Sequence, residues 1–516
     1  MNIASLLTDV VEPDRPALIL PGPVPSRITF RELDDISSRM ATGFYNLGLE
    51  AGDRVIILAP VSLDLYASLI ALFKLGVAAV FLDPQAGYRQ LDRAAELVKA
   101  RALIGSRKAI WLKWLSPALR HIPIALSAEE AGHPSLHHLA QSSPPNKTIT
   151  EVELEAPALI TFTGGSTDPG GPRGVLRTHR LLANQHAALA RALPVQPGDI
   201  DLPAFPIATL HNLSSGITSI IPDFPFHRPE AVRAEKVLHH IEQFGITTAS
   251  GSPAYWWIIA EYCFSHGIPL PLRRIVTGGA PVAPDLIKRL NQVAAHTEIL
   301  CIYGSTEVEP VAVMRADAIQ SETAALTANG AGIPLGIPVA GISVRVLGEH
   351  GEEKNTGEVG EIWVSGEHVA RGYYANPNAD SVYKRLDADG ILWHRMGDLG
   401  YRDERGRLWL AGRVHTTIVR DGRSIYPVPV EATVGMLPFV HRAALVGIDD
   451  AQLGERTCLT VEFTPCVARP AGWQTQLQTF CAEHGWIIDQ VHSIRHMPVD
   501  ARHHARIDYK RLKPRT

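Results

Sequence analysis

Four short polar segments of the sequence lie where an expected strand ends or where the composition changes. The first, residues 160–179, reads ITFTGGSTDPGGPRGVLRTH and lies between an apolar run and an expected helix. Backbone N–H groups and hydroxyls of such a loop bind polyphosphate, with Arg173 as the counter-charge. No Lys follows the last glycines, so the loop is not the pattern G-x-x-x-x-G-K-[ST]. On composition alone, an ordinary surface loop is the alternative interpretation.

The second and third segments carry carboxylates beside hydroxyl or glycine residues. Residues 303–307 (YGSTE) follow the apolar run EILCI. A hydroxyl beside a carboxylate at the carboxyl end of a strand can hold Mg²⁺ that bridges phosphate oxygens, which makes Thr306 and Glu307 candidate ligands. Residues 393–401 (WHRMGDLGY) place Asp398 in an expected tight turn, where its carboxylate could accept two ribose hydroxyls.

An alternation of helices and strands surrounds these segments. From residue 28 onward, amphipathic stretches such as LDLYASLIALFKLGV alternate with apolar runs such as AAVFLDP, which is typical of a parallel sheet with helical crossovers. Between residues 332 and 410 the pattern changes to short alternating runs separated by Gly, Asn and Asp, which is typical of antiparallel strands. After Gly412 a smaller unit begins, and Arg413, the fourth candidate, could reach ribose or phosphate across that junction.

These patterns predict an α/β fold in two domains. Residues 1–412 form a large N-terminal domain of parallel-sheet β/α layers plus a small antiparallel, barrel-like subdomain. Residues 413–516 form a small α+β domain.

Charge and composition exclude several classes of protein. The 516 residues are 46% apolar, and 49 Lys and Arg against 53 Asp and Glu give a net charge of -4. No strong positive field is present to gather nucleic acid. The five cysteines are odd in number and not in close C-x-x-C pairs, which argues against a disulfide framework and a structural zinc site. The same few cysteines make a reducing cytoplasm the expected location. Because no apolar run reaches about 18 residues, we expect no integral membrane segment.

In their order and spacing, the four segments resemble the acyl-adenylate-forming superfamily of acyl-CoA synthetases, luciferases and peptide-synthetase adenylation domains. The resemblance covers almost the whole chain and includes three further motifs, GGAPV at residues 278–282, GIPLGIPVAG at 332–341 and SGEHVARGYYANP at 365–377. It implies an enzyme that uses ATP and Mg²⁺ to activate a small-molecule carboxylic acid as an acyl-AMP. It also implies an AMP-binding N-terminal domain and a hinge near His415, about which the mobile C-terminal domain rotates between two half-reactions.

The resemblance assigns the nucleotide site to individual positions. Tyr303 would stack on the adenine, and Asp398 with Arg413 would bind the ribose. Thr306 and Glu307 would hold the nucleotide and Mg²⁺. The phosphate loop would be Thr163, Ser166, Thr167 and Arg173.

The resemblance also assigns the acid site. His211 would lie beside the acyl carboxylate, although a lone His in an apolar run is more often a core residue. Trp256 would line the acyl pocket, although neighbouring aromatic residues on a helix are more often core as well. Gly278 and Gly279 would also belong to the acid site.

Three departures from the family bear on catalysis. The phosphate loop reads T-G-G-S-T-D-P-G-G-P-R-G instead of T-S-G-S-T-G-x-P-K-G, and Asp168 would repel a triphosphate unless it points away or meets a cation. Arg506 replaces the lysine that in the family binds the carboxylate and the α-phosphate. The catalytic candidates are therefore Arg506 together with His211 and Glu307, which the resemblance assigns. Residues 418–431 replace the loop that lines the thiol tunnel, with Pro429 at a normally acidic position, which argues against coenzyme A as a second substrate.

Two local signatures indicate which branch of the superfamily the chain resembles most. W-H-R-M-G-D-x-G-Y at residues 393–401 and P-V-D-x-R-H-x-A-[KR]-I at 498–507 resemble the β-lactone synthetases of olefin biosynthesis. Those enzymes activate a β-hydroxy acid and let its own hydroxyl attack the acyl phosphate. An internal nucleophile needs no thiol tunnel, because intramolecular attack is worth effective molarities of about 10⁵ M or more.

Two other functions stay open from the sequence. One is an acyl-CoA, carrier-protein or amide ligase that uses the same acyl-AMP. The other is an adenylate-forming fold that binds a ligand without turnover, against which the retained Thr306, Glu307, Asp398 and Arg413 argue. Partner enzymes of a biosynthetic route are also expected.

Overall fold

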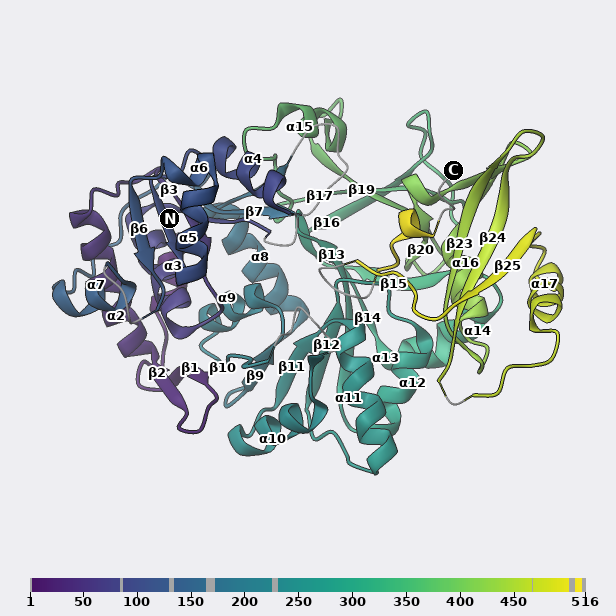
Figure 1. Ribbon diagram of the computed structural model, residues 1–516, viewed down its shortest axis with the longest axis horizontal. Coiled ribbons are helices and arrows are strands. Elements are labelled where there is room, and N and C mark those ends of the chain that lie inside the picture. The colour runs from purple at the N-terminus through teal and green to yellow at the C-terminus, as the bar shows by residue number, and fades with distance from the viewer. Residues whose placement is uncertain are drawn as a thin grey trace.

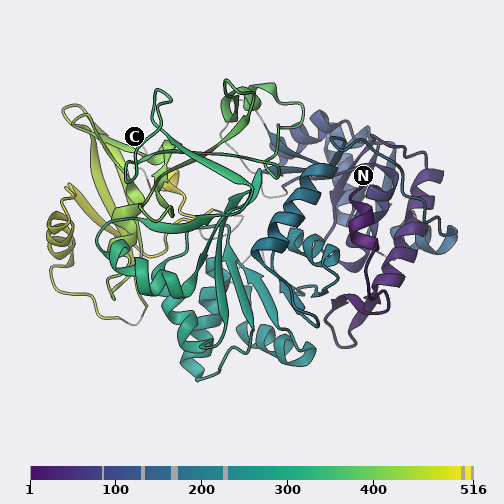
Figure 2. The same cartoon turned by 180° about the vertical axis from the view of Figure 1, so that it is seen from behind.

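Three hydrogen-bonded sheets organise the computed structural model, in which the described residues are 2–83, 87–129, 134–163, 172–224, 231–465, 467–500 and 506–512. Figure 1 shows the N-terminal sheet at one end of the molecule, the C-terminal sheet at the other and the largest sheet between them. The same order is seen from behind in Figure 2. The predicted α/β class is therefore confirmed.

The N-terminal sheet has the strand order β6-β5-β3-β4-β7-β8. Its strands are parallel except for the antiparallel pair β7 and β8. Helices connect them, and their buried apolar side chains form one core with the strands. The elements of this region are α1 (Ala4–Thr8), α2 (Phe30–Asn46), β3 (Arg54–Leu58), α3 (Leu63–Leu75), β4 (Ala78–Phe81), α4 (Tyr88–Val98), β5 (Ala102–Gly105), α5 (Arg107–Leu115), α6 (Pro117–Arg120), β6 (Ile124–Ser127), α7 (Leu136–Ser142), β7 (Pro157–Thr163) and β8 (Arg173–Thr178).

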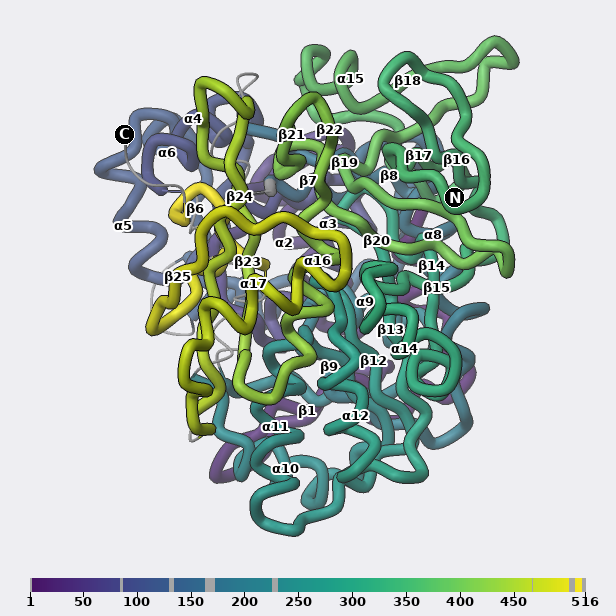
Figure 3. Tube along the Cα trace, turned by 90° about the vertical axis from the view of Figure 1, so that its right-hand side faces the viewer, coloured from purple at the N-terminus to yellow at the C-terminus, as the bar shows by residue number. Residues whose placement is uncertain are grey.

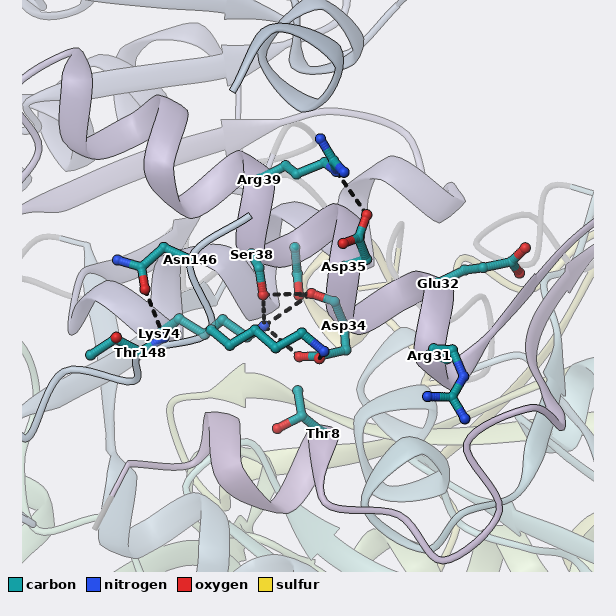
Figure 4. A network of polar contacts seen from close by, with 12 residues as sticks. Thr8, Arg31, Glu32, Asp34, Asp35, Ser38, Arg39, Lys74, Asn146 and Thr148 are labelled. Atoms are coloured by element: carbon teal, nitrogen blue, oxygen red, sulfur yellow. Dashed lines mark hydrogen bonds and ion pairs between the residues drawn. The ribbon is translucent and has the colours of Figure 1, made fainter. Parts of the chain in front are cut away.

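A buried ion pair joins α2 to α3 (Figure 4). Lys74, which is 1% exposed, donates from Nζ to Asp34 Oδ1 at 2.7 Å and to Ser38 Oγ at 2.7 Å. The same Nζ lies 3.1 Å from the backbone oxygen of Asp34. All three acceptors come from α2, so this lysine fixes how the two helices pack although its charge is buried.

The largest sheet has 14 strands, in the order β16-β17-β19-β20-β15-β14-β13-β12-β11-β9-β10-β1-β2, with β18 paired to β19. From β9 to β13 it is parallel, and from β13 through β17 its neighbours are antiparallel. The expected antiparallel subdomain therefore continues the hydrogen bonding of the parallel layer through β14 and β15. The strands are β1 (Pro16–Leu20), β2 (Ser26–Thr29), β9 (Ile200–Pro203), β10 (Thr218–Ile220), β11 (Thr248–Gly251), β12 (Arg274–Gly278), β13 (Glu298–Ser305), β14 (Val308–Arg315), β15 (Ile333–Pro338), β16 (Ile342–Leu347), β17 (Gly360–Gly366), β18 (Lys384–Leu386), β19 (Leu392–Arg402) and β20 (Leu408–Arg413).

Helices cover the parallel part of this sheet. The buried faces of α10, α11 and α12 form a second core with strands β9, β11, β12 and β13. Helices α8 and α9 lie between this sheet and the N-terminal one (Figure 1). The helices of this region are α8 (His179–Ala192), α9 (Pro206–Ser214), α10 (Ala234–Phe244), α11 (Pro253–His266), α12 (Pro284–Val293), α13 (Ala316–Ala318), α14 (Ala324–Ala328) and α15 (Pro377–Tyr383).

The C-terminal unit has its own sheet and its own core, which starts at Ile418. Its strand order is β22-β21-β24-β23, with β25 parallel to β24. Figure 3 shows this unit in front of the rest of the chain. Its elements are β21 (Ile418–Arg420), β22 (Arg423–Ile425), α16 (Pro427–Val434), β23 (Val440–Asp450), β24 (Gly454–Phe463), α17 (Trp473–Glu483) and β25 (Gln490–Ile494). The division at 412 and 413 stays a prediction.

Among the described helices, none combines the length and the apolar character that a membrane crossing requires.

Candidate active site

Three predicted nucleotide residues meet on the largest sheet, where β19 and β20 are hydrogen-bonded neighbours and β13 lies beyond β15 and β14 in the strand order. Asp398 on β19 and Arg413 on β20 are direct partners in the antiparallel register. Arg413 Nε lies 2.9 Å from Asp398 Oδ1, and the Tyr303 hydroxyl donates to Asp398 Oδ2 at 2.8 Å. Burial and the neighbouring Asp398 carboxylate raise the pKa of Tyr303 well above its ordinary value, so the phenol remains a donor. The buried Asp398 carboxylate thus lies between two donors, and its oxygens could accept hydrogen bonds from sugar hydroxyls instead.

Glu307 lies in a second polar group. The Tyr373 hydroxyl donates to Glu307 Oε1 at 2.8 Å. Burial would raise the pKa of Glu307, but His394, Lys384, the Tyr373 hydrogen bond and Arg173 outweigh it and hold the pKa at about 2. Because burial also lowers the pKa of His394 to about 3, its ring is neutral near pH 7, and the lasting positive charge comes from Lys384 and Arg173.

The Glu307 carboxylate is suited to bind Mg²⁺. Glu307 is ionised at all ordinary pH values. Among the described residues, no group of three or more His, Cys, Asp and Glu side chains could enclose a metal ion. Mg²⁺ is usually held by one or two carboxylates together with substrate phosphates and water, so a single ionised Glu beside a phosphate site suits it. The backbone oxygen of the adjacent Thr306 accepts a 2.8 Å hydrogen bond from Arg177, which fixes this turn to β8.

The predicted phosphate loop is described only at its two ends. Ser166 and Thr167 lie outside the described residues. Thr163 is the last residue of β7 and pairs in register with Arg173 at the start of β8. The Arg173 guanidinium lies 4.6 Å from the ring centroid of Tyr383 and 5.9 Å from that of Tyr373. These contacts hold a cation at the rim of the Glu307 group.

A largely apolar cavity of about 120 Å³ adjoins the nucleotide residues. Gly278 and Ile302, which face each other across β12 and β13, line one end of it, next to Tyr303. A Cβ at Gly278 would lie 2.6 Å from the Ile302 oxygen, so only glycine allows this approach. His211 on α9 and His186 on α8 line the wall. The cavity can therefore hold a small organic acid beside the nucleotide site.

Trp256 has a different position from the other predicted acid-site residues. It is 0% exposed in the core, and its Nε1 donates to the Val276 oxygen at 3.0 Å. It is not among the described residues that line the cavity. Its assignment to the pocket wall stays a prediction without geometric support, and its position fits the core interpretation that was its alternative.

The C-terminal tail reaches the mouth of this cavity. Arg506 Nε donates to the oxygen of Gly279 at 3.0 Å, which joins residues 227 positions apart. Asp500 braces the tail, because its Oδ1 accepts from the Arg506 N–H at 3.0 Å and its own N–H donates to the Arg506 oxygen at 2.8 Å. In Figure 1 the yellow tail runs from the C-terminal unit toward β13 and β15. One cation of the tail is thus placed beside the predicted acid site.

A second contact anchors the tail to α16. The Tyr509 hydroxyl donates to Glu431 Oε2 at 2.8 Å, and the Leu445 N–H donates to Glu431 Oε1 at 2.8 Å. Burial raises the pKa of Glu431 to about 7. The predicted hinge residue, His415, lies in the short 3₁₀ turn Val414–Thr416 between β20 and β21. The link between the last strand of the largest sheet and the C-terminal sheet is therefore short.

Several residues of the site were not named from the sequence. Tyr373 lies in the segment SGEHVARGYYANP and His394 in WHRMGDLGY, and both segments could have indicated them. Lys384, His186 and Arg177 lie in stretches with no local pattern that points to a site. Their positions depend on which strands and helices become neighbours.

The sequence model of the AMP-binding enzyme family matches residues 9–374. An olefin beta-lactone synthetase of Stenotrophomonas maltophilia is 31% identical and aligns with 99% of this chain and 97% of its own length. An olefin beta-lactone synthetase of Xanthomonas campestris pv. campestris is also 31% identical, over 94% of this chain and 90% of its own. The acyl-CoA ligase sidI of Aspergillus fumigatus is 26% identical, over 83% of this chain and 75% of its own.

Two solved structures have the same fold. ATP-bound MatB from Rhodopseudomonas palustris superposes with a TM-score of 0.84 at 20% identity, covering 99% of this chain and 98% of its own. The amide bond synthetase McbA from Marinactinospora thermotolerans superposes with a TM-score of 0.83 at 21% identity, with the same coverage.

Proposed function

The chain belongs to the AMP-binding enzyme family and is an ATP-dependent ligase, and we propose that it converts a β-hydroxy carboxylic acid into a β-lactone through an acyl-AMP. The observation that carries adenylation is the contact of Arg506 with Gly279 at the mouth of the cavity, beside Tyr303 and Asp398. The choice of lactone formation is supported by the similarity to two olefin beta-lactone synthetases along nearly the full length of the chain.

The nucleotide would be held by the groups that surround β13, β19 and β20. Asp398 would accept from the two ribose hydroxyls in place of the Tyr303 hydroxyl, and Arg413 would stay paired with the carboxylate. Glu307 would hold Mg²⁺, which when bound neutralises part of the charge of the phosphates. Arg173 supplies a further positive charge at the phosphates.

The acid would lie in the cavity with its carboxylate at the Gly278 and Gly279 end. The walls are largely apolar, with Leu182, Leu189 and Leu210 among the lining side chains, so the remainder of the acid is aliphatic. In the first step a carboxylate oxygen attacks the α-phosphorus, pyrophosphate leaves and an acyl-AMP forms. Arg506 offsets the repulsion between the two anions as they come into contact.

In the second step the β-hydroxyl oxygen attacks the acyl carbon, and AMP leaves. Helix α16 begins at Pro427, and its Val428 packs into the core built around β14, β15 and β20. Pro429 lies on the same helix, where the family has an acidic residue. A nucleophile carried by the substrate itself needs no path for coenzyme A, which agrees with this altered segment.

The experiment that tests the proposal is mass spectrometry of the products from ATP, Mg²⁺ and a series of β-hydroxy acids, with and without coenzyme A. We expect pyrophosphate release and a product that has lost one water relative to the acid, in both reactions. A thioester formed only with coenzyme A would instead identify an acyl-CoA ligase. Binding of ATP without pyrophosphate release for any acid would identify a ligand-binding fold. Partner enzymes that supply the acid and consume the product stay a prediction.

A further inference from the structure

Two histidines face each other in the wall of the cavity. His186 on α8 and His211 on α9 approach with their Nδ1 atoms 3.0 Å apart and their ring centroids 4.9 Å apart. Both residues line the cavity. His211 is only 8% exposed, whereas His186 is partly exposed. The pair therefore connects the inside of the cavity with a more accessible position on α8.

The contact fixes the protonation of the two rings relative to each other. Burial lowers the pKa of both, to about 3 for His211, so both rings are neutral near pH 7. A hydrogen bond between two Nδ1 atoms requires one N–H and one lone pair. One ring therefore carries its proton on Nδ1 and has a basic Nε2, and the other carries its proton on Nε2.

The basic nitrogen is available to a ligand. Among the described residues, no hydrogen bond engages Nε2 of His186 or His211. The two Nε2 atoms are also not among the fully buried polar atoms that lack a partner. The carboxylate of Asp201 also lines the cavity, but Thr248 and Asn212 already donate to it. The histidine pair thus keeps a nitrogen that can bind a ligand, whereas the Asp201 carboxylate is occupied by two structural hydrogen bonds.

Two buried hydroxyls of residues that line the cavity also lack a hydrogen-bond partner among the described residues. Ser250 Oγ and Thr277 Oγ1, on the adjacent strands β11 and β12, have no hydrogen-bond partner among the described residues. Both residues line the same cavity as the two histidines. Buried hydroxyls are normally satisfied, so these two indicate that the bound acid carries a polar substituent besides its apolar chain.

We propose that His211 and His186 together accept the proton of the substrate hydroxyl during ring closure. The β-oxygen forms a bond to the acyl carbon, the bond from that carbon to the AMP oxygen breaks, and AMP leaves with the electron pair. In this scheme His211 is the ring that carries its proton on Nδ1. The hydroxyl proton goes to Nε2 of His211, and the Nδ1 proton of His211 passes to Nδ1 of His186. This inference deepens the proposed function and rests on it.

The second histidine has a physical purpose in this scheme. A single imidazole would have to keep a positive charge among apolar side chains, which is costly. Transfer across the 3.0 Å contact moves that charge to the more exposed ring. General-base assistance is typically worth about 10² to 10⁴ in rate, and the loss of His186 should remove most of it.

The alternative base is Glu309, which lines the same cavity and whose pKa is raised by burial. The charge of Arg177 acts in the opposite direction and favours the carboxylate form. The histidine pair differs from Glu309 because a proton taken up inside the cavity can pass across the 3.0 Å contact to the more exposed ring. Because Glu309 is the remaining candidate, its variant belongs in the same experiment.

The test compares His186→Ala and Glu309→Gln with the unchanged protein. Acyl-AMP formation is followed by ATP–pyrophosphate exchange with a β-hydroxy acid and with the corresponding acid that lacks the hydroxyl. Lactone formation is followed by mass spectrometry, and accumulated acyl-AMP is trapped with hydroxylamine. For His186→Ala we expect exchange to remain near normal, lactone formation to fall by about 10² or more, and added imidazole to restore part of it. For Glu309→Gln we expect lactone formation to persist.

The possible failures are distinct. If the unchanged protein exchanges pyrophosphate but makes no lactone, the proposed function is wrong and the hydroxylamine product will show the acyl-AMP. If the unchanged protein makes lactone and His186→Ala makes it equally fast from the same amount of acyl-AMP, the proton-transfer role is wrong. Loss of lactone formation only in Glu309→Gln would assign the base to Glu309. An equal loss of both steps in His186→Ala, without rescue by imidazole, would show a merely structural role.

Discussion

Replacing Arg506 with alanine tests the contact on which the proposed adenylation depends. The guanidinium lies at the mouth of the cavity, where its Nε donates to the Gly279 oxygen at 3.0 Å. Arg506→Ala removes the cation and leaves the tail contact of Tyr509 with Glu431 in place. We expect acyl-AMP formation to slow strongly, because the carboxylate must then meet the α-phosphate without a neutralising charge.

The size of the effect follows from the position of the charge. A unit charge about 4 Å from an anion is worth about 4 kcal/mol at an effective dielectric constant of about 20. At about 1.4 kcal/mol for each factor of ten, this corresponds to about 10³ in rate. Because Arg506 is partly exposed, solvent screening reduces the value, and a loss of about 10² to 10³ is expected, in the range found for single oxyanion donors.

The assay separates the two half-reactions. Pyrophosphate release from ATP and the acid reports the first step, and conversion of a supplied acyl-AMP reports the second. Arg506→Ala should slow the first and leave the second nearly normal, and Arg506→Lys should retain or improve the first, since the family uses lysine there. Lys510→Ala is the matched control, because Lys510 is an exposed cation of the same tail and should matter little.

A normal rate of acyl-AMP formation in Arg506→Ala would refute this reasoning. Combining it with Lys510→Ala and then Lys513→Ala would show whether another tail cation has taken the role. If the combined variant is also normal, the enzyme adenylates without a tail cation.

The remaining predictions address the metal, the hinge and two buried groups. Glu307→Gln should abolish pyrophosphate release at every Mg²⁺ concentration while circular dichroism stays unchanged, and normal release would exclude the metal role. His415→Pro should lock the short link and uncouple adenylation from the second step, so normal rates of both half-reactions would show that the hinge lies elsewhere. Asp34→Ala leaves Lys74 buried without its carboxylate and should lower the free energy of unfolding by about 3 kcal/mol in a urea titration, whereas a loss near zero would contradict the burial argument. Glu431 has a folded-state pKa of about 7 against an ordinary 4.5. Its contribution to stability is therefore complete below pH 4.5 and is lost as pH rises toward 7. Glu431→Gln should lack this part of the pH dependence when the free energy of unfolding is measured at about pH 5 and about pH 8.

Local patterns were sufficient to predict the fold class. Apolar runs that alternate with amphipathic helices led to the parallel layers, and the change of pattern after residue 332 led to the antiparallel strands. The sequence did not show that both belong to one hydrogen-bonded sheet, because the pairing of β14 with β15 joins segments whose partners cannot be read locally. Strand register is a property of the assembled sheet.

The candidate site was predictable where its side chains belong to short segments with a distinctive local pattern, although Asp398 lies within β19 and not in the expected tight turn. Tyr303, Asp398 and Arg413 were each named from their own segment, and the structure brings them together. Lys384 and His186 were not named, because a lone Lys or His in an ordinary helix or strand has no distinguishing neighbours in the sequence. Their relevance arises only from packing, which places Lys384 near Glu307 and His186 against His211.

The contact between Arg506 and Gly279 also has a consequence for how the protein is made. A chain is synthesised from its N-terminus and its domains fold as they emerge, so the residues that line the cavity are made well before Arg506. Arg506, the proposed adenylation cation, follows 227 positions after the backbone oxygen that it contacts. A chain that stops before Arg506 can thus have a folded cavity and still lack the proposed adenylation cation.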